Sequence, residues 1–128
     1  MMSTSCSSQS NPTIIEIRYG SQLGECEGYC YSEMVYTEHI EKNINKAWGD
    51  TILNPTKKML QTKWTHLTTA INLSDFYSLE PTIGCPDCVD GGESWITIET
   101  NEKSYKVRYE YGEVPKPMTN LVAIIEKL

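Results

Sequence analysis

The chain has 128 residues, of which 39% are hydrophobic and 22% are charged, and its formal net charge is −6 at pH 7. This length is typical of a single domain that buries its own core, and the composition is too apolar for an intrinsically disordered protein. The negative charge and the scattered Lys and Arg residues exclude a basic stripe for nucleic acid, and no stretch approaches the roughly 18 apolar residues of a transmembrane span.

The first eleven residues are polar and predict a flexible tail, so we divide the chain into a tail, residues 1–11, and a single domain, residues 12–128. Cys6 lies in this tail after a run of small residues, a pattern typical of the acylation site of a bacterial lipoprotein. No charged segment and no apolar segment precede it, and Ser3 stands where such signals usually have Leu. Cys6 is thus a candidate lipidation site that competes with an incidental cysteine in a tail.

Alternating side chains predict strands in the first half of the domain. Residues 13–19 predict a half-buried strand that ends at Gly20, and the β-rich run 29–38 predicts a second strand antiparallel to it. Residues 41–48 predict a ragged third strand before a turn at Gly49-Asp50. One side of the first strand is formed by every second residue, namely Thr13, Ile15, Ile17 and Tyr19.

Helical signals follow in the middle of the chain, after a short strand at 57–60. Thr62 is suited to be the N-cap of a helix that ends near Asn72. Its apolar stripe has the spacing i, i+3, i+7 and consists of Trp64, Leu67 and Ile71. Residues 74–75 can cap one further turn, 76–79.

The last third of the chain has the clearest pattern. Residues 95–100 and 103–111 predict a hairpin with Asn101-Glu102 at its turn, and Pro115 or Pro117 predicts the start of a final helix. The apolar stripe of that helix consists of Met118, Leu121, Val122, Ile125 and Leu128. We therefore expect an α+β domain, with an antiparallel sheet of about five strands and two helices packed on one face.

Four of the five cysteines form two close pairs, Cys26 with Cys30 and Cys85 with Cys88. If the strands that follow the two pairs are neighbours, both loops lie at the same end of the sheet. Four thiolates there could hold a structural zinc ion, or they could form disulfides within each pair or between the loops. If the protein is exported, disulfides are the leading hypothesis. If it is cytosolic, free or metal-bound thiols are the leading hypothesis.

Other chemistry finds less support in the sequence. In thiol redox proteins the first cysteine of a C-x-x-C pair lies at the N-terminus of a helix, which lowers the pKa of its thiol. No helical pattern follows Cys85 and Cys88, and several carboxylates lie near them in the sequence. Asp87, Asp90 and Glu93 could offer oxygens to calcium, but acidic residues beside glycine are usually solvated turn formers. The two histidines, His39 and His66, are far apart in the sequence, and no Ser or Cys near either of them suggests a catalytic triad. The sequence therefore favours a protein that is not an enzyme.

Three stretches, residues 20–30, 83–96 and 107–112, resemble a family of small uncharacterised bacterial proteins, many of which are lipoproteins. The similarity covers roughly residues 12–128. The resemblance implies export and a lipid anchor at Cys6, hence an extracytoplasmic or membrane-anchored location, with a cytoplasmic location as the alternative. It implies no activity, no catalytic residue and no cofactor.

We expect a non-enzymatic binding or structural domain, with a protein as its partner, braced by its two cysteine pairs. The alternative is a structural zinc domain that uses the four thiolates of Cys26, Cys30, Cys85 and Cys88. A thiol redox protein is the more distant alternative.

Overall fold

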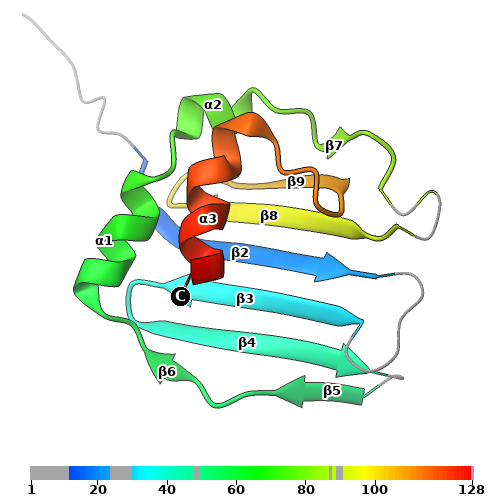
Figure 1. The fold of residues 1–128 in the computed structure, drawn as a ribbon. Coiled ribbons are helices and arrows are strands. Elements are labelled where there is room, and N and C mark those ends of the chain that lie inside the picture. Colours follow the sequence, from blue (N-terminus) through cyan, green and yellow to red (C-terminus); the bar gives the residue numbers. More distant parts are fainter. Residues whose placement is uncertain (1–11, 24–29, 48–49, 87, 89–90, 128) are drawn as a thin grey trace, which may run out of the picture.

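The computed structural model describes residues 12–23, 30–47, 50–86, 88 and 91–127 (Figure 1). These residues form a mixed α+β fold around an eight-stranded, mostly antiparallel sheet. The strand order is β5-β4-β3-β2-β8-β9-β7, with β6 also paired to β4. In chain order the elements are β2 (Ile14–Gln22), β3 (Tyr31–Thr37), β4 (Ile40–Ala47), β5 (Asp50–Leu53), β6 (Lys57–Lys58), α1 (Gln61–Thr69), α2 (Leu73–Tyr77), β7 (Thr82–Ile83), β8 (Glu93–Thr100), β9 (Ser104–Glu110), the 3₁₀ helix η1 (Lys116–Met118) and α3 (Thr119–Lys127).

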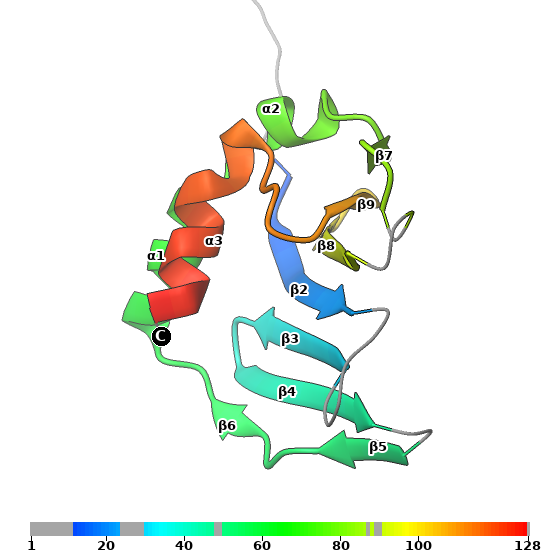
Figure 2. The same ribbon diagram turned by 45° about the vertical axis from the view of Figure 1, so that its right-hand side comes forward.

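The α+β class and the antiparallel sheet were predicted, but the sheet has more strands than the expected five, and there are three α-helices where two were expected. The additional strands β5, β6 and β7 have only four, two and two residues. Such short segments show no alternation, so only pairing reveals them. Asp50, expected in a turn, is the first residue of β5. Figure 2 shows β5 and β6 following each other along the outer edge of β4.

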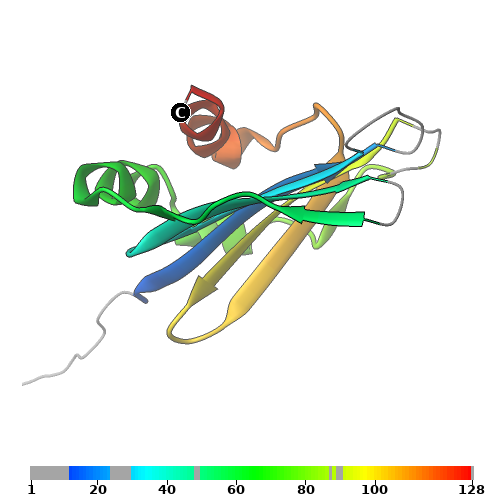
Figure 3. The same ribbon diagram turned by 90° about the horizontal axis from the view of Figure 1, so that it is seen from below.

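The hydrophobic core lies between one face of the sheet and the helices. Figure 3 shows α1 and α3 on the same face. All three α-helices contribute buried side chains to this core, namely Trp64, Leu67, Phe76, Leu121, Val122 and Ile125. The predicted stripe of the final helix is confirmed for its described residues, and Leu128 lies outside them. No helix in the described part of the chain is long and apolar enough to cross a membrane.

Two predicted helix caps are wrong. Helix α1 begins one residue before Thr62, with Leu60 at the N-cap and no side-chain cap, and it ends at Thr69 before the expected Asn72. The cap of α2 is Asn72, whose side chain accepts a hydrogen bond from the Asp75 amide (3.0 Å). The side-chain oxygen of Asn can accept a hydrogen bond from a backbone N–H of the first turn as well as the hydroxyl of Ser or Thr can. Residue type alone therefore did not identify the N-cap.

Strand β2 differs from its prediction at both ends. A register shift between Ile14 and Glu16 turns Ile14 towards the core, while Ile15 stays 44% exposed. A bulge of this kind breaks simple alternation, because it adds one residue to one strand of a pair. At the other end β2 does not stop at Gly20 but continues to Gln22.

Strands β3 and β8, which follow the two cysteine pairs in the chain, begin at the same end of the sheet, although they are not neighbours as the prediction required, because β2 lies between them. Strands β3 and β8 flank β2 and both run antiparallel to it, so both begin where β2 ends. Gln22 at the end of β2 is paired with Tyr31 on one side and with Glu93 on the other. The segments that enter β3 and β8 therefore converge on one edge of the domain.

Candidate functional site

The face of the sheet opposite the core is the candidate site, and we call it the open face. Strand register assigns it the residues Glu16, Arg18, Gly20, Gln22, Tyr31, Glu33, Val35, Thr37, Lys42, Ile44, Lys46, Glu93, Trp95, Thr97, Glu99, Ser104, Lys106, Arg108 and Glu110. Its five cationic and five acidic side chains balance, so the rest of the chain carries the whole formal charge of −6.

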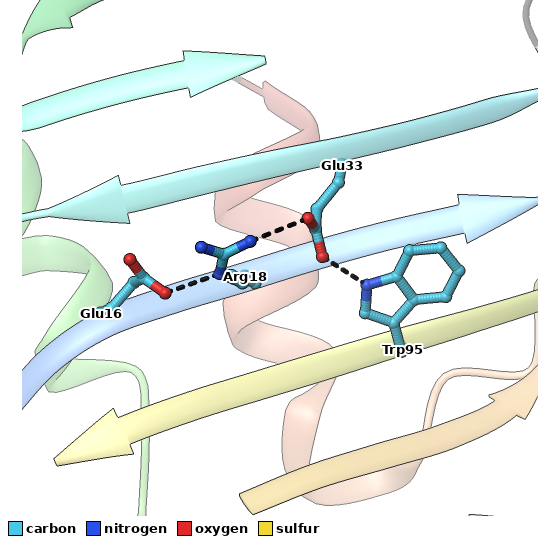
Figure 4. A network of polar contacts seen from close by, with 4 residues as sticks. All are labelled: Glu16, Arg18, Glu33 and Trp95. Atoms are coloured by element: carbon cyan, nitrogen blue, oxygen red, sulfur yellow. Dashed lines mark hydrogen bonds and ion pairs between the residues drawn. The ribbon is translucent and has the colours of Figure 1, made fainter. Parts of the chain in front are cut away.

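Glu33 is the centre of a polar network on this face (Figure 4). One of its carboxylate oxygens accepts a hydrogen bond from Trp95 Nε1 (2.8 Å), and the other accepts one from Arg18 Nη1 (3.1 Å). Arg18 Nε also donates to Glu16 Oε1 (2.6 Å), and this bond is the main reason why the pKa of Arg18 is raised. The network therefore joins β2, β3 and β8 and fixes the guanidinium as a cation.

The central side chains of the network are shielded from solvent although no helix covers them. Trp95 is only 4% exposed, Glu33 7% and Val35 1%. A buried carboxylate is tolerated where its oxygens are paired, and here both oxygens accept a charge-assisted or indole hydrogen bond. Long side chains of neighbouring strands thus provide the cover that helices provide on the other face.

Gly20 makes room for the Trp95 ring. The two residues are direct cross-strand partners, and a Cβ atom at Gly20 would come closer than 3.0 Å to Cζ2, Cε2 and Nε1 of the indole. Any larger residue would therefore displace the indole from Glu33. This requirement for space explains why a glycine occurs in the middle of a strand.

Two lysines and a tyrosine complete the aromatic centre. The Tyr31 and Trp95 rings lie 5.3 Å apart, centroid to centroid, in a tilted arrangement. Lys46 Nζ lies 4.5 Å from the Tyr31 centroid, and Lys106 Nζ lies 5.1 Å from the Trp95 ring. Both distances are within the range of cation–π attraction. Burial is the main cause that raises the pKa of Tyr31.

A second ion pair lies towards the edge of the open face. Arg108 donates from Nε and Nη2 to the two oxygens of Glu93, each at 3.0 Å. These bonds are the main reason why the pKa of Glu93 is lowered. Glu93, which we considered as a calcium ligand, is thus held by an arginine. Asp87 and Asp90, the other candidates, lie outside the described residues.

The structure brings Cys85 and Cys88 together in a disulfide with a Cα–Cα distance of 5.5 Å. Cys30 is disulfide-bonded as well. Because Cys85 and Cys88 are bonded to each other, a bridge from Cys26 or Cys30 to either of them, which the sequence left open, is not formed. Cys6 and Cys26 lie outside the described residues. Within the described residues, no group of three or more His, Cys, Asp or Glu is placed to hold a metal ion.

The described residues offer little that resembles a catalytic centre. His39 has an 86% exposed side chain in the turn after β3, and His66 is exposed on α1. A cavity of about 640 Å³ lies beside the start of β2 and α2, where it is lined by residues such as Ile14, Ile71 and Tyr77. This cavity lies on a different part of the molecule from the network and contains no nucleophile paired with a base.

No protein-family model matches the chain, and no curated protein matches it. The function is therefore inferred from the chain's own geometry. Tyr29, Tyr31 and Trp95 lie near the cysteine pairs in the sequence, which makes them candidates for the edge of a binding surface. The structure packs Tyr31 and Trp95 against each other, and Tyr29 lies outside the described residues. Arg18, Gly20 and Glu33 were missed as members of the site, since their meeting depends on strand register that alternation does not reveal.

Proposed function

We propose that the protein is a non-enzymatic binding domain that contacts another protein through the open face. The observation that carries this proposal is the residue set at its centre. Trp, Tyr and Arg are the residue types enriched among the energetically dominant positions of protein interfaces. The open face presents Tyr31 and both arginines of the chain, Arg18 and Arg108, while Trp95 is buried and packs against the Tyr31 ring.

The open face is also held in place before any partner arrives. Arg18 and Arg108 each make two hydrogen bonds to carboxylates, and Trp95 is bonded to Glu33. Ordering flexible side chains at an interface costs about 0.5–1.5 kcal/mol for each. Side chains that are already fixed avoid most of this cost, which favours the use of this face for recognition.

Charge supports the same surface. The chain is acidic overall, but the open face is balanced, with Lys42, Lys46 and Lys106 lying outside the carboxylate pairs described above. Another acidic protein would be repelled by the rest of the surface and least by this face. We therefore expect a partner that places carboxylates against these lysines and an apolar group beside Tyr31.

The cysteines have a structural role in this proposal. Disulfides persist mainly in oxidising compartments, and the three described cysteines are all disulfide-bonded. This supports an extracytoplasmic location for the domain. Alkylation in acid-quenched cells of the native host tests it: protection of Cys30 is expected, and labelling of Cys30 would contradict it. Lipidation of Cys6 stays a prediction.

The binding proposal is tested by comparing three forms of the folded protein as bait on extracts and membranes of the native host. The forms are wild type, an open-face variant Lys46→Glu/Lys106→Glu, and a matched control Lys116→Glu/Lys127→Glu. Both variants change the net charge equally, but the control residues lie on η1 and α3. A partner is expected with the wild type and the control, and at least about tenfold less with the open-face variant.

Recovery of the same partner at equal level with both variants would contradict the proposal, as would failure to retain any protein on the wild-type bait. Circular dichroism of the three forms shows whether the substitutions leave the fold intact. A partner lost equally from both variants would indicate a general charge effect and would also contradict binding through the open face.

A further inference from the structure

The Cys85–Cys88 disulfide is placed where a reagent in solution can reach it. Both residues are exposed, and they lie on the loop between β7 and β8. The bridge closes a very small ring, with a sequence separation of 3. A hydrogen bond from the Cys88 amide to the Cys85 carbonyl (3.2 Å) forms a turn inside it. Exposed disulfides are the ones that undergo exchange most readily, whereas shielded structural ones resist reduction.

Cys30 has a different setting, which makes it an internal reference. Cys30 is partly buried at the start of β3. Its carbonyl accepts a hydrogen bond from the Leu23 amide (2.8 Å), which continues the pairing of β2 with β3. The chain around Cys30 is therefore tied into the sheet, while Cys85 and Cys88 lie beyond the end of β7.

Two carboxylates lie near the exposed disulfide, and their negative charge should favour some reductants over others. A hollow of about 120 Å³ beside the two sulfurs is also lined by Glu110 and Glu113. The Glu110 carboxylate lies against Gly84, where a Cβ atom would collide with it, so this charge lies beside the residue that precedes Cys85. Carboxylates repel an anionic thiol such as glutathione more strongly than a thiol that carries no other charge.

We propose that Cys85–Cys88 is a thiol–disulfide exchange site that accepts two electrons from a dithiol. A thiolate of the dithiol attacks one sulfur, forming a mixed disulfide, and the other cysteine leaves as a thiolate and takes up a proton. The second thiol of the reductant then attacks its own sulfur in the mixed disulfide. The products are two cysteine thiols in this protein and an oxidised, disulfide-bonded reductant.

The exchange does not require the domain to unfold. Before the bridge, the Arg108 amide donates to the Pro81 carbonyl (2.8 Å), and after it the Tyr111 amide donates to the Gly92 carbonyl (3.3 Å). These bonds tie both ends of the loop to β9 independently of the disulfide. The site is independent of the proposed partner binding, because exchange needs only exposed sulfurs and a dithiol.

The test follows reduction of the native, oxidised protein by dithiothreitol over time. Samples are quenched in acid, alkylated and digested, and the label on each cysteine is measured by mass spectrometry. We expect Cys85 and Cys88 to be labelled at least about tenfold faster than Cys30, while circular dichroism stays unchanged. Equal rates, faster labelling of Cys30, or labelling only after loss of structure would overturn the proposal.

Two further measurements sharpen the result. The folded variant Cys85→Ser/Cys88→Ser should lose the fast phase and keep the slow one. The variant Glu110→Gln/Glu113→Gln should raise the rate with glutathione more than the rate with dithiothreitol, and an equal change would contradict the selection by charge. Metal analysis of untreated protein is the remaining control, since one zinc per chain held by these cysteines would overturn an exchange site.

Discussion

The two faces of the sheet exclude water in different ways. On the helix-covered face, apolar side chains such as Ile17, Ile98 and Val107 are completely buried beneath helices. On the open face, Trp95 is nearly as inaccessible, but its cover consists of neighbouring polar side chains held by hydrogen bonds and cation–π contacts. The first face depends on tertiary packing of helices and the second on strand register alone.

This difference separates two kinds of stabilising interaction. Burial of apolar area on the helix-covered face is the main favourable term in folding. The open face adds smaller, directional interactions whose partners must lie within about 3 Å of each other. On the helix-covered face, the loss of stability should therefore depend mainly on how much apolar area a substitution removes. On the open face, it should depend on whether a substitution keeps individual donor and acceptor atoms in place.

The largest effect is expected for Phe76→Ala on the helix-covered face. Phe76 is fully buried and its ring makes a T-shaped contact with Tyr105. Truncation of a buried phenylalanine typically lowers the free energy of unfolding by about 3–5 kcal/mol. Urea denaturation measures the loss, and Leu60→Ala is the control, because Leu60 is 63% exposed and should change stability by less than about 0.5 kcal/mol. Similar values for both variants would contradict the assignment of the core.

The next effect is expected for Gly20→Ala on the open face. The added methyl group collides with the Trp95 ring, and overpacking of this kind costs about 1–3 kcal/mol. Trp95→Leu provides the matched background, since the smaller side chain leaves space at Gly20. A double-mutant cycle in urea should show that the cost of Gly20→Ala falls in that background. An unchanged cost would mean that the glycine serves the backbone and not the ring.

Glu33→Ala should have a slightly smaller effect, because it leaves Trp95 Nε1 without an acceptor and removes one of the two carboxylates from Arg18. An unsatisfied buried donor costs about 1–3 kcal/mol. Glu33→Gln keeps an acceptor for the indole and should recover much of that loss. The two variants separate the hydrogen bond from the charge, and equal losses would show that only the charge matters.

At high pH, two tyrosines on the helix-covered face should lower the stability of the fold. Burial is the main cause that raises the pKa of Tyr19 and of Tyr36 to about 12. Tyrosines of the unfolded chain ionise near 10. The unfolded state therefore loses protons first, and the free energy of unfolding falls as pH rises through this window. Tyr36→Phe should reduce this slope, and an unaltered alkaline slope would contradict the assignment.

At low pH the open face should contribute the smallest effect. Hydrogen bonds from Arg108 lower the pKa of Glu93, so its stabilisation is complete above the unfolded value near 4.3 and is lost as pH falls through the folded value. Glu93→Gln should therefore flatten the acid limb of the stability profile slightly, because the ion pair is partly exposed and screened by water. Glu99→Gln, an exposed carboxylate on the same strand, is the control and should leave that limb unchanged.

Local patterns in the sequence were enough to predict much of the fold. The hairpin that became β8 and β9 and the stripe of α3 were found because their apolar periods are long and regular. These features depend on neighbours in the chain, which a sequence displays directly.

Tertiary structure alone decided the features that join distant residues. Residues Gly20, Glu33 and Trp95 come from three strands, and their meeting depends on the register in which β3 and β8 pair with β2. The choice of disulfide partners was also left open by the sequence. In the structure, Cys85 is bonded to Cys88, three residues later in the chain. Alternation places Glu16 and Arg18 on the same side of β2, but it does not say which residues of β3 and β8 lie beside them, because a register shift of one residue exchanges the face that a neighbouring strand presents.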